Sequence, residues 1–377
     1  PLSSDYGLCS LTVHFRRTWH KPMSKESKEL SMPSSSPDTQ RTMTAVVTRS
    51  GGSVDIPDVL VDATVPAPAA PTGHDILVEV KALSVNPVDV KVRAALNHAG
   101  GEERILGWDA AGTVIAVGEQ TTLFQPGDDV YYAGALERPG SYGQLQLVDE
   151  RIVGPKPRSL DYASAAALPL TSLTAWEALF DKLHLSRDSA GTILVLGAAG
   201  GVGSMVIQLT KALTDVSVIA TASREESRDW VRSLGADAVV DHFAEDLAQQ
   251  VLAIAPDGVD YVFTPQSRGR VPLLTTVVRP FGEIVAIDDE RDLDLYALKD
   301  KAISWHWEFM FARPRHGYDL ITQHHILSTV AELIDSGRIR GTASQTLTPR
   351  NAAQIRAAHR LIESGRTVGK IVVTDAG

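Results

Sequence analysis

Alternating apolar and polar positions characterise the chain between residues 43 and 154. In ILVEVKALSVN (76–86) the two kinds of residue alternate, as in a strand with one buried face. Glycine and proline separate several such segments, and strands at this spacing indicate a compact β-barrel. The segments are MTAVVTRSGG (43–52), ILVEVKALSVN (76–86), ILGWDAAGTVIAVG (105–118), PGDDVYYAG (126–134) and SYGQLQLVDERIVG (141–154), with a Pro/Ala-rich link at 65–71.

The pattern changes near Leu160. Residues 162–180 have helical spacing, and TILVLG (192–197) is a continuous apolar segment, typical of a strand buried on both faces. Helices are then expected at 202–213, 225–234 and 244–254, and strands at 216–220, 238–242, 259–263, 282–287 and 302–309. This alternation predicts a doubly wound α/β domain. The tail, which ends in GKIVV (369–373), is too short to stand alone, so we expect it to return to the first domain.

The strand at 192–197 leads into a glycine-rich loop that is followed at once by a helix. The loop comprises Gly197, Ala198, Ala199, Gly200, Gly201, Val202 and Gly203, and its spacing is a variant of the dinucleotide fingerprint. Glycine lets the backbone approach a pyrophosphate closely, and the helix N-terminus offers N–H groups to that anion. A flexible turn is the alternative, but the strand before and the helix after favour a cofactor site.

The residues after the next strand indicate the form of the cofactor. NAD enzymes place Asp or Glu there to bind the ribose hydroxyls. Here the segment reads Ala-Thr-Ala-Ser223-Arg224, and a hydroxyl with a guanidinium suits a 2′-phosphate. Arg228, one helical turn further, is positioned to assist. The sequence therefore favours NADP, although Arg224 is also compatible with a solvated residue at a helix start.

Composition excludes several classes of function. The net charge of −10 over 377 residues is opposite to that of a nucleic-acid-binding surface. The one cysteine, Cys9, excludes an intramolecular disulfide and a thiolate metal cage, and it fits a cytoplasmic location. The sequence has no apolar run of about 18 residues, so we expect no membrane-spanning helix. The Ser/Pro-rich start predicts a poorly ordered leader over residues 1–42.

Several motifs together resemble the medium-chain dehydrogenase/reductase superfamily over residues 43–375. Within it, the chain is similar to the zinc-type alcohol dehydrogenase-like proteins, close to the quinone oxidoreductases. The resemblance implies a GroES-like β-barrel catalytic domain at 43–165 and 315–377 and a Rossmann NADP-binding domain at 166–314. The motifs are MTAVV, VNPVD, LGWDAAGTVIAVG, PGDDV, AALPLTSLTAWEAL, GAAGGVG, LGADAVVD and GKIVV.

The resemblance also implies where a zinc site would lie, and the residues there differ. Zinc alcohol dehydrogenases supply a cysteine where this chain has 86–89, and a Gly-His-Glu motif where it has Gly107-Trp108-Asp109. Without thiolates a tetrahedral zinc site of that type cannot form. Asp89 and Asp109 are carboxylates that a different metal site would use, but nothing in their spacing demands it. We therefore expect no metal.

Candidate site residues follow from the same resemblance. In the quinone reductase group, Asn86, Asp89, Trp108 and Asp109 line the cleft beside the nicotinamide. Thr171 and Thr174 map to the nicotinamide side, and Lys370 maps near the cofactor's phosphates. Two family positions depart from the pattern, because a lysine that binds the 2′-phosphate falls on Ser227 and a tyrosine that shares this role falls on His242. Tyr132 is a further candidate in the barrel.

Each of these residues also has a purely structural interpretation. Asn86 and Asp89 suit a helix cap, Trp108 suits a core, Asp109 suits a satisfied buried acid, and Tyr132 suits a barrel position with its hydroxyl in water.

The chemistry without zinc favours quinones and α,β-unsaturated carbonyls, because these acceptors delocalise the incoming charge. Asn86 and Tyr132 are then the candidate hydrogen-bond donors to the enolate, and Tyr132 or water is the candidate proton source.

The resemblance further implies a homodimer that pairs through the strand at 302–309. That strand carries aromatic residues but no flanking basic track, so it does not indicate nucleic-acid stacking. The expected function is an NADPH-dependent reductase of quinones or enones that works on a small-molecule substrate. A zinc-dependent alcohol dehydrogenase and a non-catalytic NADPH-binding protein are the two alternatives.

Overall fold

The computed structural model describes residues 41–96 and 103–375. Most of the expected leader at 1–42 therefore lies outside the described residues. A three-stranded antiparallel sheet has the order β2-β1-β4, from Val61–Pro66, Thr42–Thr48 and Arg104–Ile105. A seven-stranded sheet follows the order β15-β16-β3-β5-β6-β8, with β7 also paired to β3. Its strands are β3 (Asp75–Val85), β5 (Ala110–Val117), β6 (Asp129–Tyr132), β7 (Leu145–Asp149), β8 (Val153–Pro155), β15 (Ala343–Leu347) and β16 (Lys370–Thr374).

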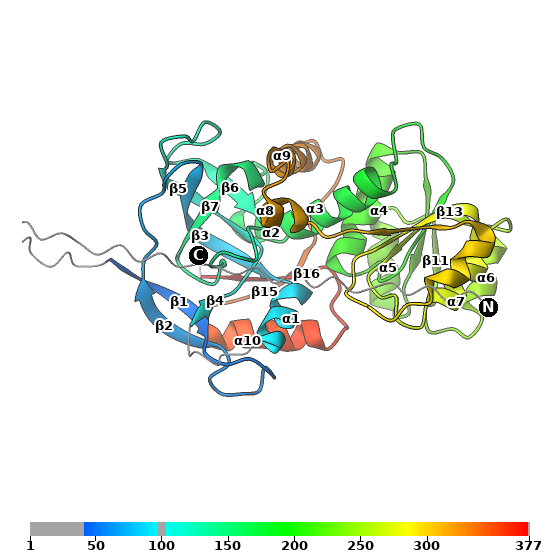
Figure 1. The fold of residues 1–377 in the computed structure, drawn as a ribbon, viewed down its shortest axis with the longest axis horizontal. Coiled ribbons are helices and arrows are strands. Elements are labelled where there is room, and N and C mark those ends of the chain that lie inside the picture. Colours follow the sequence, from blue (N-terminus) through cyan, green and yellow to red (C-terminus); the bar gives the residue numbers. More distant parts are fainter. Residues whose placement is uncertain (1–40, 97–102, 376–377) are drawn as a thin grey trace, which may run out of the picture. The chain divides into compact units, whose positions relative to one another are not determined.

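The second part contains a six-stranded parallel sheet of order β11-β10-β9-β12-β13-β14 (Figure 1). In chain order this is 3-2-1-4-5-6, the Rossmann arrangement. The side of the sheet on which successive strands are added changes between β9 and β12. The strands are β9 (Thr192–Val195), β10 (Ser217–Thr221), β11 (Ala238–Val240), β12 (Val259–Thr264), β13 (Val278–Ala286) and β14 (Ser304–Trp307). The α/β class with a GroES-like part and a Rossmann part is thus confirmed.

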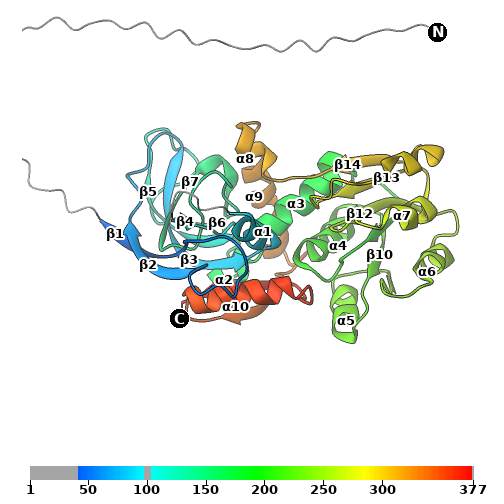
Figure 2. The same cartoon turned by 60° about the horizontal axis from the view of Figure 1, so that its bottom comes forward.

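Helices cover both faces of the parallel sheet. Ile193 and Val195 pack in the cluster that holds α4, whereas Leu194 points to the cluster of α6 and α7. Figure 2 shows α4 and α7 on opposite sides of the strands. Here the helices are α4 (Gly201–Leu213), α5 (Glu225–Ser233), α6 (Leu247–Ile254), α7 (Val271–Val277) and the 3₁₀ helix η3 (Leu295–Lys301). Burial on both faces explains why TILVLG is apolar throughout.

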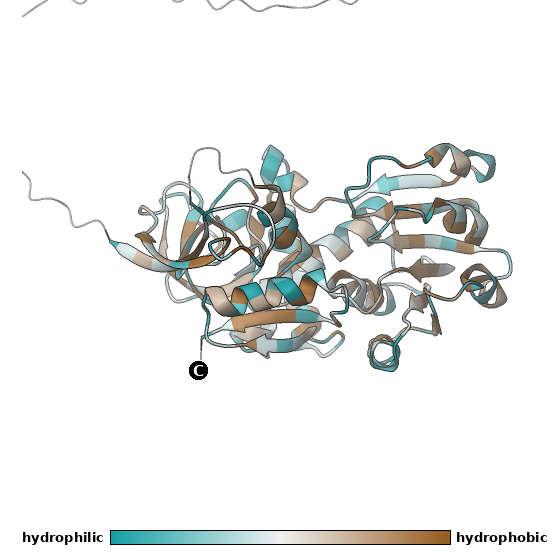
Figure 3. Ribbon diagram, turned by 90° about the horizontal axis from the view of Figure 1, so that it is seen from below, coloured by the Kyte–Doolittle hydropathy of each residue, from teal (hydrophilic) through white to brown (hydrophobic). Residues whose placement is uncertain are grey.

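The remaining helices lie around the seven-stranded sheet and the link between the two parts. They are α1 (Pro87–Ala95), the 3₁₀ helix η1 (Glu150–Ile152), α2 (Tyr162–Ala166), α3 (Pro169–Trp176), the π-helix η2 (Glu177–Lys182), α8 (Ala312–His316), α9 (Ile321–Asp335) and α10 (Ala352–Glu363). Pro169 begins α3 and separates it from α2. In Figure 3, α10 shows apolar and polar positions side by side, and its buried face carries Ile355, Ala358 and His359.

The tail is tied to the first part of the chain by strand pairing. Residues 371–374 of β16 pair antiparallel with 82–85 of β3, and β15 extends the same sheet in parallel. The expected domain boundaries at 165/166 and 314/315 stay predictions. Two strands were not expected: β2 overlaps the region interpreted as a link, and β15 lies where a helical tail was expected. None of the helices in the described ranges is long and apolar enough to cross a membrane.

Candidate active site

The glycine-rich loop lies between β9 and α4, at the point where the strand order reverses. Gly197 has φ +61°, a left-handed conformation that favours glycine. A Cβ on Gly203 would lie 2.6 Å from Gly197 O and 2.7 Å from Ala198 Cα, so the helix can approach the strand only because residue 203 has no side chain. Gly200 is the N-cap of α4. The loop thus has the geometry that a pyrophosphate site requires.

The last strand of the chain lies against this loop. The backbone N–H of Gly369 donates to Ala199 O (2.8 Å), and Gly200 and Gly369 form a β-bridge. A Cβ on Gly201 would lie 2.6 Å from Lys370 Cδ and 2.9 Å from Thr171 Cγ2. Gly201 is therefore needed where the side chains of β16 and α3 cross the start of α4. Val202 follows in the first turn of α4. Thr174 lies one turn after Thr171 on α3, and both threonines are buried.

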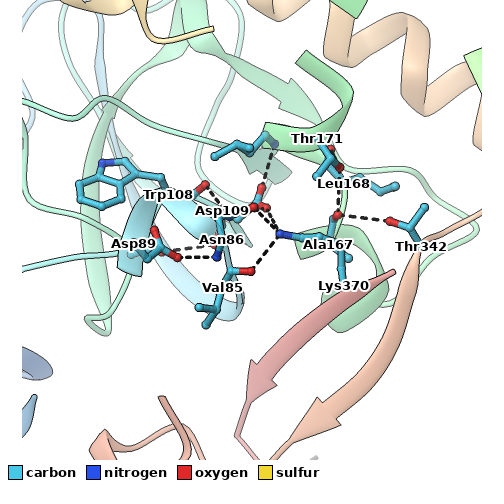
Figure 4. A network of polar contacts seen from close by, with 12 residues as sticks. Val85, Asn86, Asp89, Trp108, Asp109, Ala167, Leu168, Thr171, Thr342 and Lys370 are labelled. Atoms are coloured by element: carbon cyan, nitrogen blue, oxygen red, sulfur yellow. Dashed lines mark hydrogen bonds and ion pairs between the residues drawn. The ribbon is translucent and has the colours of Figure 1, made fainter. Parts of the chain in front are cut away.

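Three buried side chains form a network beside the loop (Figure 4). Asn86 Nδ2 donates to Asp109 Oδ2 (3.0 Å) and to Trp108 O (3.3 Å). Lys370 Nζ donates to Asn86 Oδ1 (2.5 Å) and Val85 O (3.2 Å), and it lies 3.1 Å from Asp109 Oδ2. Asp109, Lys370 and Asn86 are 0%, 4% and 1% exposed. The network therefore joins β16, β3 and the segment before β5 out of contact with solvent.

Asp109 also fixes the helix that carries the two threonines. Its Oδ1 accepts a hydrogen bond from the backbone N–H of Leu170 (2.9 Å) in the first turn of α3, where a negative charge is favourable. Burial raises the pKa of Asp109, and the Lys370 ammonium acts in the opposite direction. Asp109 is thus a satisfied buried acid that positions Thr171 and Thr174.

The network changes two expectations drawn from the sequence. Both amide hydrogens of Asn86 and all three ammonium hydrogens of Lys370 have partners, so neither group has a donor left for a substrate oxygen. Lys370 was expected beside the cofactor's phosphates. Its stem does lie on Gly201, but its ammonium points to Asn86 and Asp109. A role for Asn86 as the enolate donor would require this network to open.

Asp89 lies at the N-terminus of α1 and caps it. Its Oδ2 accepts from the backbone N–H of Asn86 (2.7 Å) and from the hydroxyl of Tyr142 (3.1 Å). Complete burial raises the pKa of Asp89 to about 7, although the hydrogen bond from Asn86 and the charge of Lys370 oppose this shift. The capping interpretation of Asp89 is therefore confirmed, and the residue is nevertheless next to the network.

Trp108 and Tyr132 lie in cores. The indole of Trp108 is fully buried, donates to Ala135 O (3.0 Å) and contacts Phe311 edge-on at 6.4 Å between ring centroids. Tyr132 packs in the barrel cluster, and its hydroxyl has no hydrogen-bond partner among the described residues. The structure does not bring Tyr132 to the network, and its hydroxyl is buried, not in water. Its role as a donor stays a prediction that no described contact supports.

A second part of the site is a cavity of about 610 Å³ next to the loop. Ser223, Arg224 and His242 line it, as expected for a site at the adenosine end of a cofactor. Arg224 Nη2 donates to Arg366 O (2.6 Å). The Nδ1 of His242 is buried without a partner among the described residues, and burial lowers the pKa of this ring. Arg228 instead forms an ion pair with Asp241 (3.0 Å) and does not line the cavity.

Two arginines of this cavity were not found from the sequence. Arg270 lies at the start of α7, and Arg366 lies between α10 and β16. Together with Arg224 they make three arginines among the residues that line the cavity, and no Asp or Glu is among these residues. Neither arginine belongs to a local motif. Only the fold brings residue 366, which belongs to the tail, beside the end of β10.

Comparison with known proteins identifies the family. The model of the alcohol dehydrogenase GroES-like domain matches residues 72–158, and that of a zinc-binding dehydrogenase matches residues 234–373. A zinc-type alcohol dehydrogenase-like protein of Staphylococcus aureus is 41% identical over 313 residues, which cover 80% of this chain and 91% of the relative. The chain belongs to the medium-chain dehydrogenase/reductase superfamily, as a zinc-type alcohol dehydrogenase-like protein.

Further relatives support this assignment. A 2-methylene-furan-3-one reductase of Solanum lycopersicum is 30% identical over 330 residues, covering 85% of this chain and 76% of the relative. A crystal structure from Rhizobium etli, described as a zinc-dependent alcohol dehydrogenase protein, has a TM-score of 0.85 and 46% identity, covering 89% of this chain and 99% of that one. This medium-chain dehydrogenase/reductase is thus an oxidoreductase of a family that typically uses a nicotinamide cofactor.

The donors at the position of a zinc site do not fit zinc in this medium-chain dehydrogenase/reductase. Where relatives with catalytic zinc need thiolate or imidazole ligands, the site presents Asn86, Asp89 and Asp109. Asp109 is already paired with the Lys370 ammonium at 3.1 Å, so its negative charge is balanced by a side chain and not left for a metal ion. Residues 41–96 and 103–375 contain no group of three His, Cys, Asp or Glu that could hold a metal ion.

Proposed function

We propose that this protein is an NADPH-dependent oxidoreductase that reduces quinones or α,β-unsaturated carbonyls by hydride transfer without zinc. The observation that carries the proposal is the Asn86–Asp109–Lys370 network, which lies beside a complete dinucleotide loop at the position where the family resemblance implies the zinc site of alcohol dehydrogenases. The relative named 2-methylene-furan-3-one reductase supports an enone-type acceptor.

The acceptor class follows from the charge that hydride delivery leaves behind. A zinc ion stabilises an alkoxide by several kcal/mol as a Lewis acid, and the donors present here do not fit one. A quinone or an enone spreads the charge over a conjugated system, so it needs less stabilisation than a simple ketone does. Such acceptors are therefore the better match to this site.

The chain's own residues bind and orient the cofactor. A bound nicotinamide would supply the hydride. The N–H groups at the start of α4 face the pyrophosphate position, and the loop conformation set by Gly197 and Gly203 allows close approach. Asp109 holds the α3 helix, and with it Thr171 and Thr174, against the loop. The buried network excludes water behind this surface.

The NADP form is supported by the cavity at the end of β10. Three arginines line it. No Asp or Glu is among its lining residues, so they include no carboxylate that would repel a phosphate or bind a 2′-hydroxyl. Arg224 and Arg366 come from different parts of the fold and are joined by one hydrogen bond. We propose that they bind the 2′-phosphate together with Arg270.

Replacing Arg224 and Arg366 together with alanine is expected to raise the KM for NADPH about 10- to 100-fold, because charge-assisted hydrogen bonds to phosphate are lost. The KM for NADH should change less than about twofold, since NADH lacks the phosphate. Steady-state kinetics with both cofactors measure this. Arg228→Ala is the matched control, because Arg228 pairs with Asp241 outside the cavity. An equal loss for both cofactors would contradict a phosphate site.

The reaction itself is tested with purified full-length protein and a panel of quinones, enones, aldehydes and primary alcohols. We expect NADPH oxidation with quinones or enones, and no loss of rate after dialysis against a chelator. Stoichiometric zinc whose removal abolishes turnover would establish the alcohol dehydrogenase alternative. Tight NADPH binding without turnover on any acceptor would favour a non-catalytic role.

We also propose a homodimer formed through β14. This strand is at the edge of the six-stranded sheet. Its last residue, Trp307, is 45% exposed, and Phe309, which follows the strand, is 41% exposed. Sedimentation velocity at micromolar concentration tests it, and a monomer would refute it. The cytoplasmic location stays a prediction.

A further inference from the structure

A second buried polar chain runs from the network towards the surface. The hydroxyl of Tyr142 lies 3.1 Å from Asp89 Oδ2 and 3.0 Å from His359 Nε2, and His359 Nδ1 lies 3.5 Å from Arg93 Nη1. Arg93 in turn pairs with Glu363, which is partly exposed. Tyr142, His359, Asp89 and Arg93 are each at most 1% exposed. Four buried polar side chains in series are costly unless each one is satisfied.

The partners fix the direction of every hydrogen bond in this chain. A guanidinium only donates, so His359 Nδ1 must accept from Arg93 and the ring hydrogen must lie on Nε2. His359 then donates to the Tyr142 oxygen, and Tyr142 donates its own hydrogen to Asp89. A neutral ring agrees with this assignment, because burial and the nearby Arg93 lower the pKa of His359 to about 3.

The chain ends at the carboxylate that holds the Asn86 backbone. Asp89 Oδ2 accepts from Tyr142 and from Asn86 N–H, whereas Asp89 Oδ1 has no hydrogen-bond partner among the described residues. Among the described residues, Tyr142 is thus the one side-chain donor to Asp89. The side chain of Asn86 accepts from Lys370, whose stem lies on Gly201 of the cofactor loop, so a change at Tyr142 reaches the loop through Asp89, Asn86 and Lys370.

We propose that Tyr142 and His359 are positioning residues of the active site, which with Arg93 hold the Asp89 carboxylate and through it the Asn86 end of the network. This inference rests on the proposed reductase function for its kinetic readout. Neither residue touches substrate or cofactor in this scheme. Both act by keeping Asp89 an acceptor.

The ionisation of Asp89 should then limit activity on the acid side. Protonated Asp89 is a poorer acceptor for the Asn86 N–H, so the network loosens as pH falls. The groups that face Asp89 are Asp109, which opposes its ionisation, and Lys370 and Tyr142, which favour it; His359 and Arg93 act through Tyr142. Since burial already raises the pKa of Asp89 to about 7, loss of the Tyr142 hydrogen bond should raise it further.

The test compares Tyr142→Phe with Tyr131→Phe. Tyr131 is also fully buried, but its hydroxyl donates to Leu327 O, away from the chain. For Tyr142→Phe, we expect the acid limb of the kcat/KM profile to move up by about one pH unit, with wild-type rates approached at high pH. Tyr131→Phe should follow the wild-type profile. Superposable profiles for Tyr142→Phe and wild type, or equal shifts in both variants, would overturn the proposal.

Two further measurements do not need turnover. Nitrogen NMR of histidine-labelled wild-type protein, assigned with His359→Gln, should show the ring hydrogen of His359 on Nε2, and an Nδ1-protonated ring would refute the chain. NADPH fluorescence titrations should show a pH-dependent Kd that shifts in Tyr142→Phe and not in Tyr131→Phe. If no acceptor is reduced, the proposed function fails, but these two results still decide the positioning role.

Discussion

Gly203→Ala is expected to lower NADPH affinity at least tenfold and to destabilise the protein by about 1–3 kcal/mol, the usual range for overpacking. The added Cβ would lie within 2.8 Å of Gly197 O, Ala198 Cα and Ala198 O. All three are backbone atoms that no rotamer change can move, so α4 must shift away from the loop. Thermal unfolding without cofactor and a fluorescence titration with NADPH measure the two effects.

Gly200→Ala separates stability from binding. At Gly200 the nearest atom to an added Cβ is Gly197 O at 3.3 Å, and φ is −73°. We expect unfolding close to wild type, so any loss of NADPH affinity in this variant reports approach of the cofactor alone. Wild-type stability and affinity in Gly203→Ala would show that the contact between α4 and the loop is not the constraint described above.

Lys370→Met is expected to destabilise the protein by about 3–5 kcal/mol at neutral pH, because it leaves the buried Asp109 carboxylate without its counter-ion. Lys211→Met is the matched control: Lys211 pairs with Asp237 at 3.0 Å, but both side chains are exposed, so about 0–1 kcal/mol is expected. The double variant Lys370→Met/Asp109→Asn should recover part of the loss. Chemical denaturation of the four proteins measures these differences.

The deficit of Lys370→Met should depend on pH with a defined sign. Burial raises the pKa of Asp109, and removal of Lys370 raises it further. An acid whose folded pKa lies above its unfolded value costs stability as pH rises through that interval. The deficit should therefore be largest at neutral and alkaline pH and shrink as pH falls and Asp109 becomes protonated. A deficit that is constant with pH would mean that lost packing, not the unpaired charge, is the cause.

Local patterns predicted the parts of the fold whose cause is local. The conformations of Gly197 and Gly203 follow from a strand, a turn and a helix that are adjacent in sequence, and TILVLG is apolar because both faces of its strand are buried. β2 was missed although Val61, Ala63 and Val65 alternate with polar residues, because its end overlaps the Pro/Ala-rich segment that was interpreted as a link, and its side chains alternate between partly buried and exposed. β15 was missed because Ser344, Gln345 and Thr346 are polar and all exposed, so the segment shows no buried face.

The candidate site shows where sequence reasoning reaches its limit. The resemblance selected Asn86, Asp109 and Lys370, and the fold does bring them together. It could not reveal that their hydrogens are all engaged, because this depends on distances between β3, the segment before β5 and β16. Arg366 lies 142 residues after Arg224, and only tertiary structure makes them neighbours.

The backbone hydrogen bond between Gly369 and Ala199 has a consequence for biosynthesis. The loop at 197–203 emerges from the ribosome long before residues 369 and 370, which supply its backbone partner and the Lys370 side chain that covers Gly201. A nascent chain can thus form the parallel sheet but not the finished nucleotide cradle. Acquisition of the cofactor should follow synthesis of β16, and a premature stop that removes β16 should yield a product with poor cofactor retention, although it removes no strand of the six-stranded sheet.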